Sequence, residues 1–246
     1  MAVLSLALLT LTSCVAATDP NAQAQTNAGT IDTQSPQNVS TAIQLLLLVT
    51  VLSMAPAILV MVTSFTRIII VLSLVRNAIG IPQLPPNQVM IGLALFLTAF
   101  VMAPAIKQIN NEAVQPYLNG TLTQQEAFNR GEAPLRTFML KQTRQQDLGL
   151  FLKLSDTEKP ETVDDVPTYV LVPAFTISEL KTAFQMGFVM FVPFLIIDLI
   201  VSSALLSMGM MMLPPVIVSL PFKILLFVLV DGWYLIIGSL VGSFAK

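Results

Sequence analysis

The sequence predicts an all-α membrane protein with four apolar helical elements, bent and hairpin-like, and a helical insertion between the second and third. Three observations predict this class. The 246-residue chain is 54% hydrophobic, and its mean hydropathy is +0.78. Charged residues make up 11% of it, against about 25% in average soluble domains. Finally, four long apolar runs are separated by proline-rich or charged segments, as expected of helices that enter a bilayer.

The composition argues against an enzyme. The chain has no His and a single Cys, Cys14, so it lacks most side chains used in zinc sites, thiol catalysis and proton transfer near pH 7. It has no Walker A, GxGxxG, HExxH or GxSxG motif. The net charge of -2 is too balanced for nucleic-acid binding. We therefore expect no catalytic residues, no metal, no cofactor and no nucleic-acid partner.

The N-terminus is predicted to be a signal peptide, residues 1–17. The apolar run 3–11 is too short to span a bilayer, and small residues follow it. An alternative is a lipoprotein box that ends at Cys14. Residues 18–40 have no apolar periodicity and are expected to be a disordered linker.

The first helical hairpin region is residues 41–106. Its first apolar element, residues 43–74, carries a single charge, Arg67. As one helix it would be about 48 Å long, whereas the hydrocarbon core is about 30 Å thick. It must therefore tilt, kink at Pro56 or leave the membrane. A proline-rich connection separates it from the second element, 88–106.

Residues 107–180 contain most of the charged residues and are predicted to be a soluble, periplasmic domain. Thr123 and Glu126 have the spacing of a capping box, which marks a helix start. Pro134 is predicted to open an amphipathic helix, residues 134–154, as its first residue.

The second helical hairpin region is residues 181–246. Thr176 and Glu179 have capping-box spacing and predict the start of its first apolar element, residues 183–206. The other apolar element is residues 222–244.

A methionine loop, residues 207–215, separates these two elements and ends in a proline pair. Methionine is unbranched and adapts to irregular surfaces. Copies of the loop that converge on an axis would form a ring that seals against water and deforms around unfolded chains. Two alternatives are ordinary core or lipid-facing residues and a copper(I) thioether site. The candidate gasket residues are Met208, Met210, Met211 and Met212.

Four ionisable residues lie in the apolar elements, where an unpaired charge is costly: Arg67, Asp198, Lys223 and Asp231. Structural pairing of the two aspartates with Arg67 or Lys223 is the favoured interpretation. The alternative is that they line a conduit as proton-sensitive groups.

Two further groups are candidates for contacts between helices or chains. Gly238 and Gly242 have the spacing that permits close helix packing. Phe138 and Phe151 are large apolar residues in a polar stretch, and form either a small core or a surface for self-association. Glu179 is a further candidate for self-association.

A further set of stretches covers the chain from about residue 43 to residue 244: 63–73, 85–89, 92–98, 138–140 with 143–144, 172–175 with 177–184, 194–198, 207–215, 220–223 and 228–233. Together these stretches resemble the FliP family of flagellar type III export proteins.

The resemblance implies a core subunit of the protein export gate, in the flagellar basal body of the bacterial inner membrane. It implies several copies of this chain with FliQ and FliR, contacted by FlhB, whose helical hairpins surround a pore for unfolded flagellar substrates. It also implies that the methionine loop seals the resting pore and that some apolar elements do not cross lipid. An ion-coupled small-solute transporter, a structural scaffold and a subunit of a virulence injectisome remain alternatives.

Overall fold

The computed structural model describes residues 36–81, 83–155, 162–210 and 212–245, and the regular elements among them are all helices. The predicted all-α class is confirmed for these residues. The signal peptide, Cys14 and most of the predicted linker lie outside them. The chain forms two units, residues 1–52 and 53–246, and the tertiary contacts described below lie within the second.

The first apolar element is two helices rather than one. Helix α2 spans Pro36–Val62 and therefore begins inside the predicted linker, at a proline, whose fixed φ suits a first helical turn. Helix α3 spans Phe65–Ile79. The hydroxyls of Thr63 and Thr66 donate to carbonyls of α2 at 2.7 and 2.9 Å. The Thr63 bond is of a kind also made inside helices, whereas the Thr66 bond reaches back six residues and joins the start of α3 to the end of α2 across the break.

The second apolar element continues past the predicted boundary at residue 106. Helix α4 spans Asn87–Ile109, and a π-helical turn, Asn110–Val114, joins it to α5, Gln115–Leu118. The connection from α3 to α4 is held by Arg76, which donates to the Pro85 carbonyl at 3.2 Å and to Asn87 at 2.6 Å.

Helix α6, Gln124–Gln142, starts at the predicted capping box. The Glu126 N–H donates to the Thr123 hydroxyl at 3.4 Å, and the Thr123 N–H donates back to the Glu126 carboxylate at 3.0 Å. The hydrogen bonds from the Thr123 backbone and hydroxyl lower the pKa of Glu126. Because this pKa is lowered in the folded state, the cap stabilises the helix at neutral pH and is lost as the pH falls through the lowered value.

The prediction that Pro134 opens a helix is wrong. The cap at Thr123 has already started α6, and Pro134 lies buried inside it. The chain instead breaks after Gln142, where Arg144 is extended, and α7 then spans Gln145–Leu154. Sequence periodicity continued through this break because both helices have apolar faces.

Helix α8, Thr168–Ser207, is 40 residues long, about 60 Å at 1.5 Å per residue. A short 3-10 turn, Val163–Asp165, precedes it. The predicted helix start at Thr176 lies inside α8, so that prediction is wrong. The predicted domain boundary at residues 180–181 also lies inside α8, and it stays a prediction, because one helix can continue from a soluble domain into a membrane. The Thr176 hydroxyl donates to the carbonyl four residues earlier at 2.9 Å, a bond compatible with a helix interior.

The last apolar element is a bent pair of helices. Helix α9 spans Pro215–Leu229 and α10 spans Gly232–Gly242, with a bend of 64° between them. Helix α8 ends at Ser207 and α9 starts at Pro215, so the methionine loop lies between them and the fourth element begins before the predicted residue 222.

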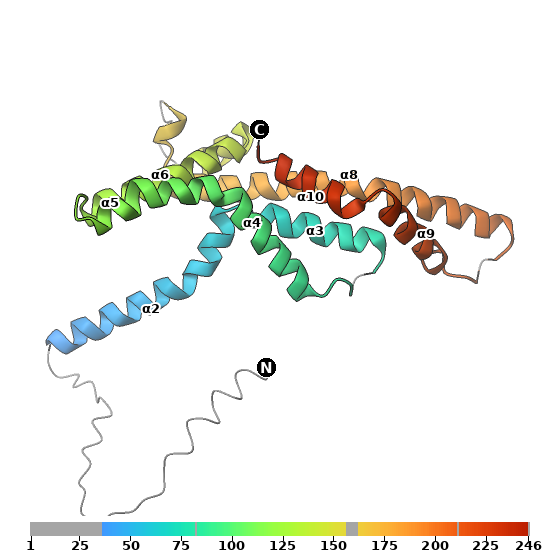
Figure 1. The fold of residues 1–246 in the computed structure, drawn as a ribbon, viewed down its shortest axis with the longest axis horizontal. Coiled ribbons are helices and arrows are strands. Elements are labelled where there is room, and N and C mark those ends of the chain that lie inside the picture. The colour runs from blue at the N-terminus through green and yellow to red at the C-terminus, as the bar shows by residue number, and fades with distance from the viewer. Residues whose placement is uncertain (1–35, 82, 156–161, 211, 246) are drawn as a thin grey trace, which may run out of the picture. The chain divides into compact units, whose positions relative to one another are not determined.

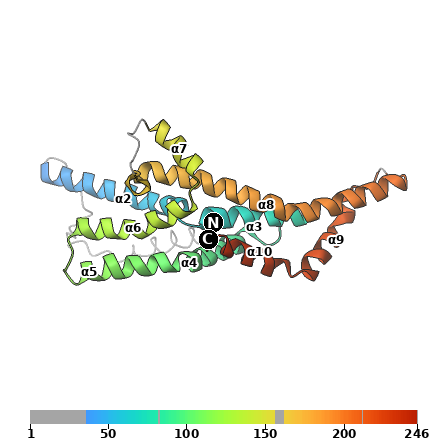
Figure 2. The ribbon, with the colours of Figure 1, turned by 90° about the horizontal axis from the view of Figure 1, so that it is seen from above.

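Helix α3 packs along α8, and α9 returns beside the C-terminal part of α8 as a hairpin (Figures 1 and 2). Two apolar clusters hold this unit together. The larger joins α3 to α4, α8, α9 and α10 and includes the fully buried Ile68, Leu72 and Leu240. The smaller is centred on Met139 and Phe175, at the junction of α6, α7 and α8.

Two helical stretches among the described residues are long and apolar enough to cross a membrane, Asn87–Leu118 and Thr168–Ser207. The number rises to four if each of two bent pairs, Ile43–Met54 with Pro56–Val62 and Pro215–Leu229 with Gly232–Gly242, forms one span.

Candidate functional site

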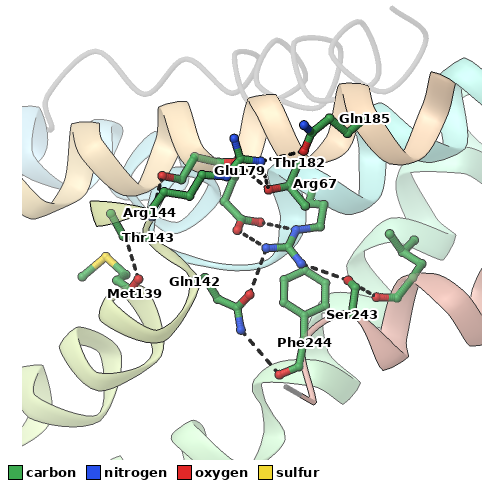
Figure 3. Close-up of polar contacts among 12 residues, drawn as sticks. Arg67, Met139, Gln142, Thr143, Arg144, Glu179, Thr182, Gln185, Ser243 and Phe244 are labelled. Atoms are coloured by element: carbon green, nitrogen blue, oxygen red, sulfur yellow. Dashed lines mark hydrogen bonds and ion pairs between the residues drawn. The ribbon is translucent and has the colours of Figure 1, made fainter. Parts of the chain in front are cut away.

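Arg67 of α3 and Glu179 of α8 form a buried ion pair, with side chains 2% and 0% exposed. The Arg67 Nε donates to one carboxylate oxygen at 2.9 Å and Nη2 donates to the other, so the pairing is bidentate (Figure 3). A guanidinium fork matches a carboxylate in this geometry. The prediction that Asp198 or Asp231 pairs with Arg67 is wrong. Glu179 was assigned to a helix cap because local spacing does not reveal a partner 112 positions away.

The same guanidinium binds the C-terminal segment of the chain. Its Nη1 donates to the Ser243 hydroxyl at 2.9 Å, and its Nη2 donates to the side-chain oxygen of Gln142 at 3.0 Å. The centroid of the Phe244 ring lies 4.0 Å from the guanidinium carbon (Figure 3). The same ring stacks on Phe138 at 6.1 Å between centroids. Arg67 therefore connects α3, α6, α8 and the C-terminal segment.

Arg144, in the break between α6 and α7, is bound to α8 by three hydrogen bonds. Its backbone N–H donates to Ser178 at 3.0 Å, and its Nη2 donates to Thr182 at 3.1 Å and to Gln185 at 2.7 Å (Figure 3). Ser178 in turn donates to Asp147 at 2.6 Å. Sequence reasoning missed this group, because its polar residues resemble an ordinary solvated surface.

Lys223 and Asp198 pair across the hairpin of α8 and α9, at 2.6 Å. Ser219 donates to the other carboxylate oxygen at 2.6 Å. Lys223 is 4% exposed. A Cβ at Gly80, which ends α3 with a φ of +93°, would lie 3.9 Å from the Lys223 Nζ. The pair therefore fixes the stem of the hairpin beside the end of α3. Pairing of Asp198 with Lys223 is one of the pairings considered in the sequence analysis.

Asp231 does not pair with Arg67 or Lys223, which are bound to Glu179 and Asp198. It is exposed, between α9 and α10, with a φ of 49°. Asp tolerates this left-handed conformation better than most residues, so the residue marks the bend.

The methionine loop lies at the tip of the hairpin, beyond the Lys223–Asp198 pair. Met208, Met210 and Met212 are 64%, 44% and 98% exposed. Met211 lies outside the described residues. The loop methionines therefore belong to no core in the described part of this chain, and the tip presents an apolar surface.

Gly238 and Gly242 face open space within the chain. A Cβ at either would meet no described atom within 4 Å. Gly238 lines a groove of about 640 Å³ between α4 and α10, together with Leu97, Phe100, Tyr234, Leu235, Ile237, Ser239 and Val241. Whatever packs against these glycines must come from outside the described chain.

The three candidates for self-association lie in or beside the protein interior. Phe138 and Phe151 pack on the smaller apolar cluster. Glu179 is completely buried in its pair with Arg67, so its carboxylate contributes nothing to the exposed surface of the chain.

Two close contacts were not found from the sequence. A Cβ on Gly187 of α8 would lie 2.3 Å from the Leu74 Cδ1 of α3, and one on Gly232 would lie 2.3 Å from the Phe227 ring. The glycines allow α3 to approach α8 and α10 to fold against α9. A single glycine in an apolar run is a weak signal of this kind.

The described residues contain no group of three or more His, Cys, Asp or Glu side chains that could hold a metal ion. The buried charges there are paired with each other across helices. This arrangement can hold a bent hairpin and present its apolar tip.

The FliP family matches residues 48–240. The flagellar biosynthetic protein FliP of Bacillus subtilis (strain 168) is 59% identical over 209 residues, which cover 85% of this chain and 95% of that protein. The protein of the same name from Pectobacterium carotovorum subsp. carotovorum is 55% identical over 85% of this chain and 81% of its own. That from Aquifex aeolicus (strain VF5) is 51% identical over 84% of this chain and 87% of its own. With similarity this high along nearly the whole fold, the chain belongs to the FliP family.

Proposed function

We propose that this chain is a pore-forming subunit of the flagellar type III protein export gate. Several copies assemble in the bacterial inner membrane, within the flagellar basal body, with FliQ-like, FliR-like and FlhB-like subunits. Together they conduct unfolded flagellar substrates outward and seal the pore at rest. The chain itself performs no catalysis and needs no cofactor.

The exposed methionine loop carries this proposal. Met208, Met210 and Met212 are 64%, 44% and 98% exposed, while the stem of the loop is fixed by the Lys223–Asp198 pair. An adaptable apolar tip on a fixed stem suits a seal that several copies build together, because thioether side chains pack on irregular surfaces.

The rest of the exposed apolar surface supports assembly with other subunits and contact with lipid. Phe96, Phe100 and Tyr234 are 82%, 71% and 74% exposed on α4 and α10. Patches of this kind mark protein or membrane contacts. We place the predicted soluble domain, residues 107–180, in the periplasm, because it includes α6 and α7, which do not qualify as spans.

The gasket is tested by replacing Met210, Met211 and Met212 with alanine in cells that assemble the gate. We expect the resting membrane to leak ions, because shorter side chains leave the constriction open, while the subunit still assembles. Ion flux is measured in cells that lack export substrates. Met54→Ala is the matched control, because Met54 is 60% exposed but lies on α2.

Unchanged ion flux together with normal secretion would contradict the gasket. Gene deletion tests the broader role: hook and filament proteins should disappear from the medium and return on complementation. Continued export after deletion would instead favour a solute transporter or an injectisome subunit.

A further inference from the structure

The described methionines differ widely in accessibility, and outside the loop Met54 and Met61 of α2 are 60% and 48% exposed. Met90, Met102 and Met139 are each 2% exposed and lie in helix-packed interiors. In the loop, by contrast, Met212 is 98% exposed and Met208 is 64% exposed. The loop therefore concentrates reactive thioethers at one place, outside any helix.

We propose that Met208, Met210 and Met212 form a reversible oxidation site, and that their oxidation by peroxide opens the resting seal. The opening rests on the function proposed above, whereas the modification itself does not. A thioether lone pair attacks one peroxide oxygen, the O–O bond breaks, and the transferred oxygen forms a sulfoxide. The sulfur is oxidised by two electrons, and the peroxide is reduced to water. A methionine sulfoxide reductase reverses the change with thiol electrons.

The loop provides few protein partners for a sulfoxide oxygen. The backbone N–H groups of Met208, Gly209, Met210 and Leu213 already donate to carbonyls within the hairpin. The nearby ammonium of Lys223 is bound to Asp198. A sulfoxide in this loop must therefore bind water, because a buried polar oxygen without a hydrogen bond is costly. A seal that excludes water when reduced would admit it when oxidised.

The site is tested by treating membranes that contain the assembled gate with hydrogen peroxide. Peptide mass spectrometry then follows the gain of one oxygen per methionine with time. We expect Met208, Met210 and Met212 to be oxidised before Met90, Met102 and Met139, which serve as internal controls in the same chain. Methionine sulfoxide reductase with dithiothreitol should return the loop peptide to its original mass. Equal oxidation rates for the loop methionines and the three buried methionines would rule out the proposed oxidation site. Failure of the reductase to restore the original mass would rule it out as well.

Opening is tested by measuring ion flux in the same membranes before and after peroxide. We expect peroxide to increase the ion flux and the reductase to reverse this increase. A variant that combines Met208→Leu, Met210→Leu, Met211→Leu and Met212→Leu should show the same ion flux before and after peroxide. An increase that persists in this variant would assign the leak to another site. A fully oxidised loop with no increase would overturn the opening step. If alanine at the loop causes no leak, the proposed gasket fails, but the order of oxidation still decides the modification site.

Discussion

Arg67 binds three side chains and an aromatic ring from separate parts of the chain. A guanidinium has five N–H donors and no acceptor, so the residue needs a full set of acceptors once buried. The apolar sequence around it predicts that need. The hydrogen-bonded partners lie 75 to 176 positions away, where no local pattern reveals them.

Replacing Arg67 with alanine should destabilise the protein by about 3–5 kcal/mol, because it leaves Glu179 as an unpaired buried charge. Glu179→Gln should also destabilise it, and the double variant should lose less than the sum of the two. Thermal unfolding of the purified protein in detergent measures these effects. Lys153→Ala, at an exposed position, is the control. Additive losses would show that the two residues are not coupled.

At the scale of the helices, the glycines have two different roles. The space beside Gly187 is filled by Leu74 of the facing helix, whereas the space beside Gly238 is open. The small-xxx-small spacing pointed to Gly238 and gave no sign of Gly187. Packing within the chain and packing between chains are thus indistinguishable from spacing alone, because both need a small residue.

Gly187→Leu should destabilise the isolated subunit by about 1–3 kcal/mol, the usual cost of overpacking. Gly238→Leu should leave its stability unchanged and reduce assembly into a multi-subunit complex. Unfolding of the isolated subunit and native gel mobility of the assembled complex measure the two effects. Loss of subunit stability in Gly238→Leu would mean that α10 packs against its own chain.

At the scale of the whole chain, the C-terminal segment closes the structure on itself. Ser243 and Phe244 reach the guanidinium of Arg67, and Gln142 of α6 donates to the Phe244 carbonyl at 3.5 Å. The α6–α8 region and α10 are therefore joined through residues at the end of the chain. Nothing in the last apolar run, residues 222–244, predicted this role.

Phe244→Ala should lower stability by about 1–2 kcal/mol, because it removes a partly desolvated cation–π contact. It should also make α6 and α7 easier to cleave with protease. Ala245→Ser, at an exposed neighbouring position, is the control and should behave like the unmodified chain. Limited proteolysis with mass spectrometry gives the cleavage sites, and equal cleavage of the two variants would exclude this coupling.

The sequence by itself determined the helical class, the cap at Thr123, and the loop between Ser207 and Pro215. These features depend on hydrophobicity, capping chemistry and proline geometry, which act between residues close together in the chain. The tertiary structure alone decided that Glu179 pairs with Arg67, that Thr176 lies inside a 40-residue helix, and that Gly187 receives Leu74. These outcomes depend on which helices approach one another, and that choice is made by packing between segments far apart in the sequence.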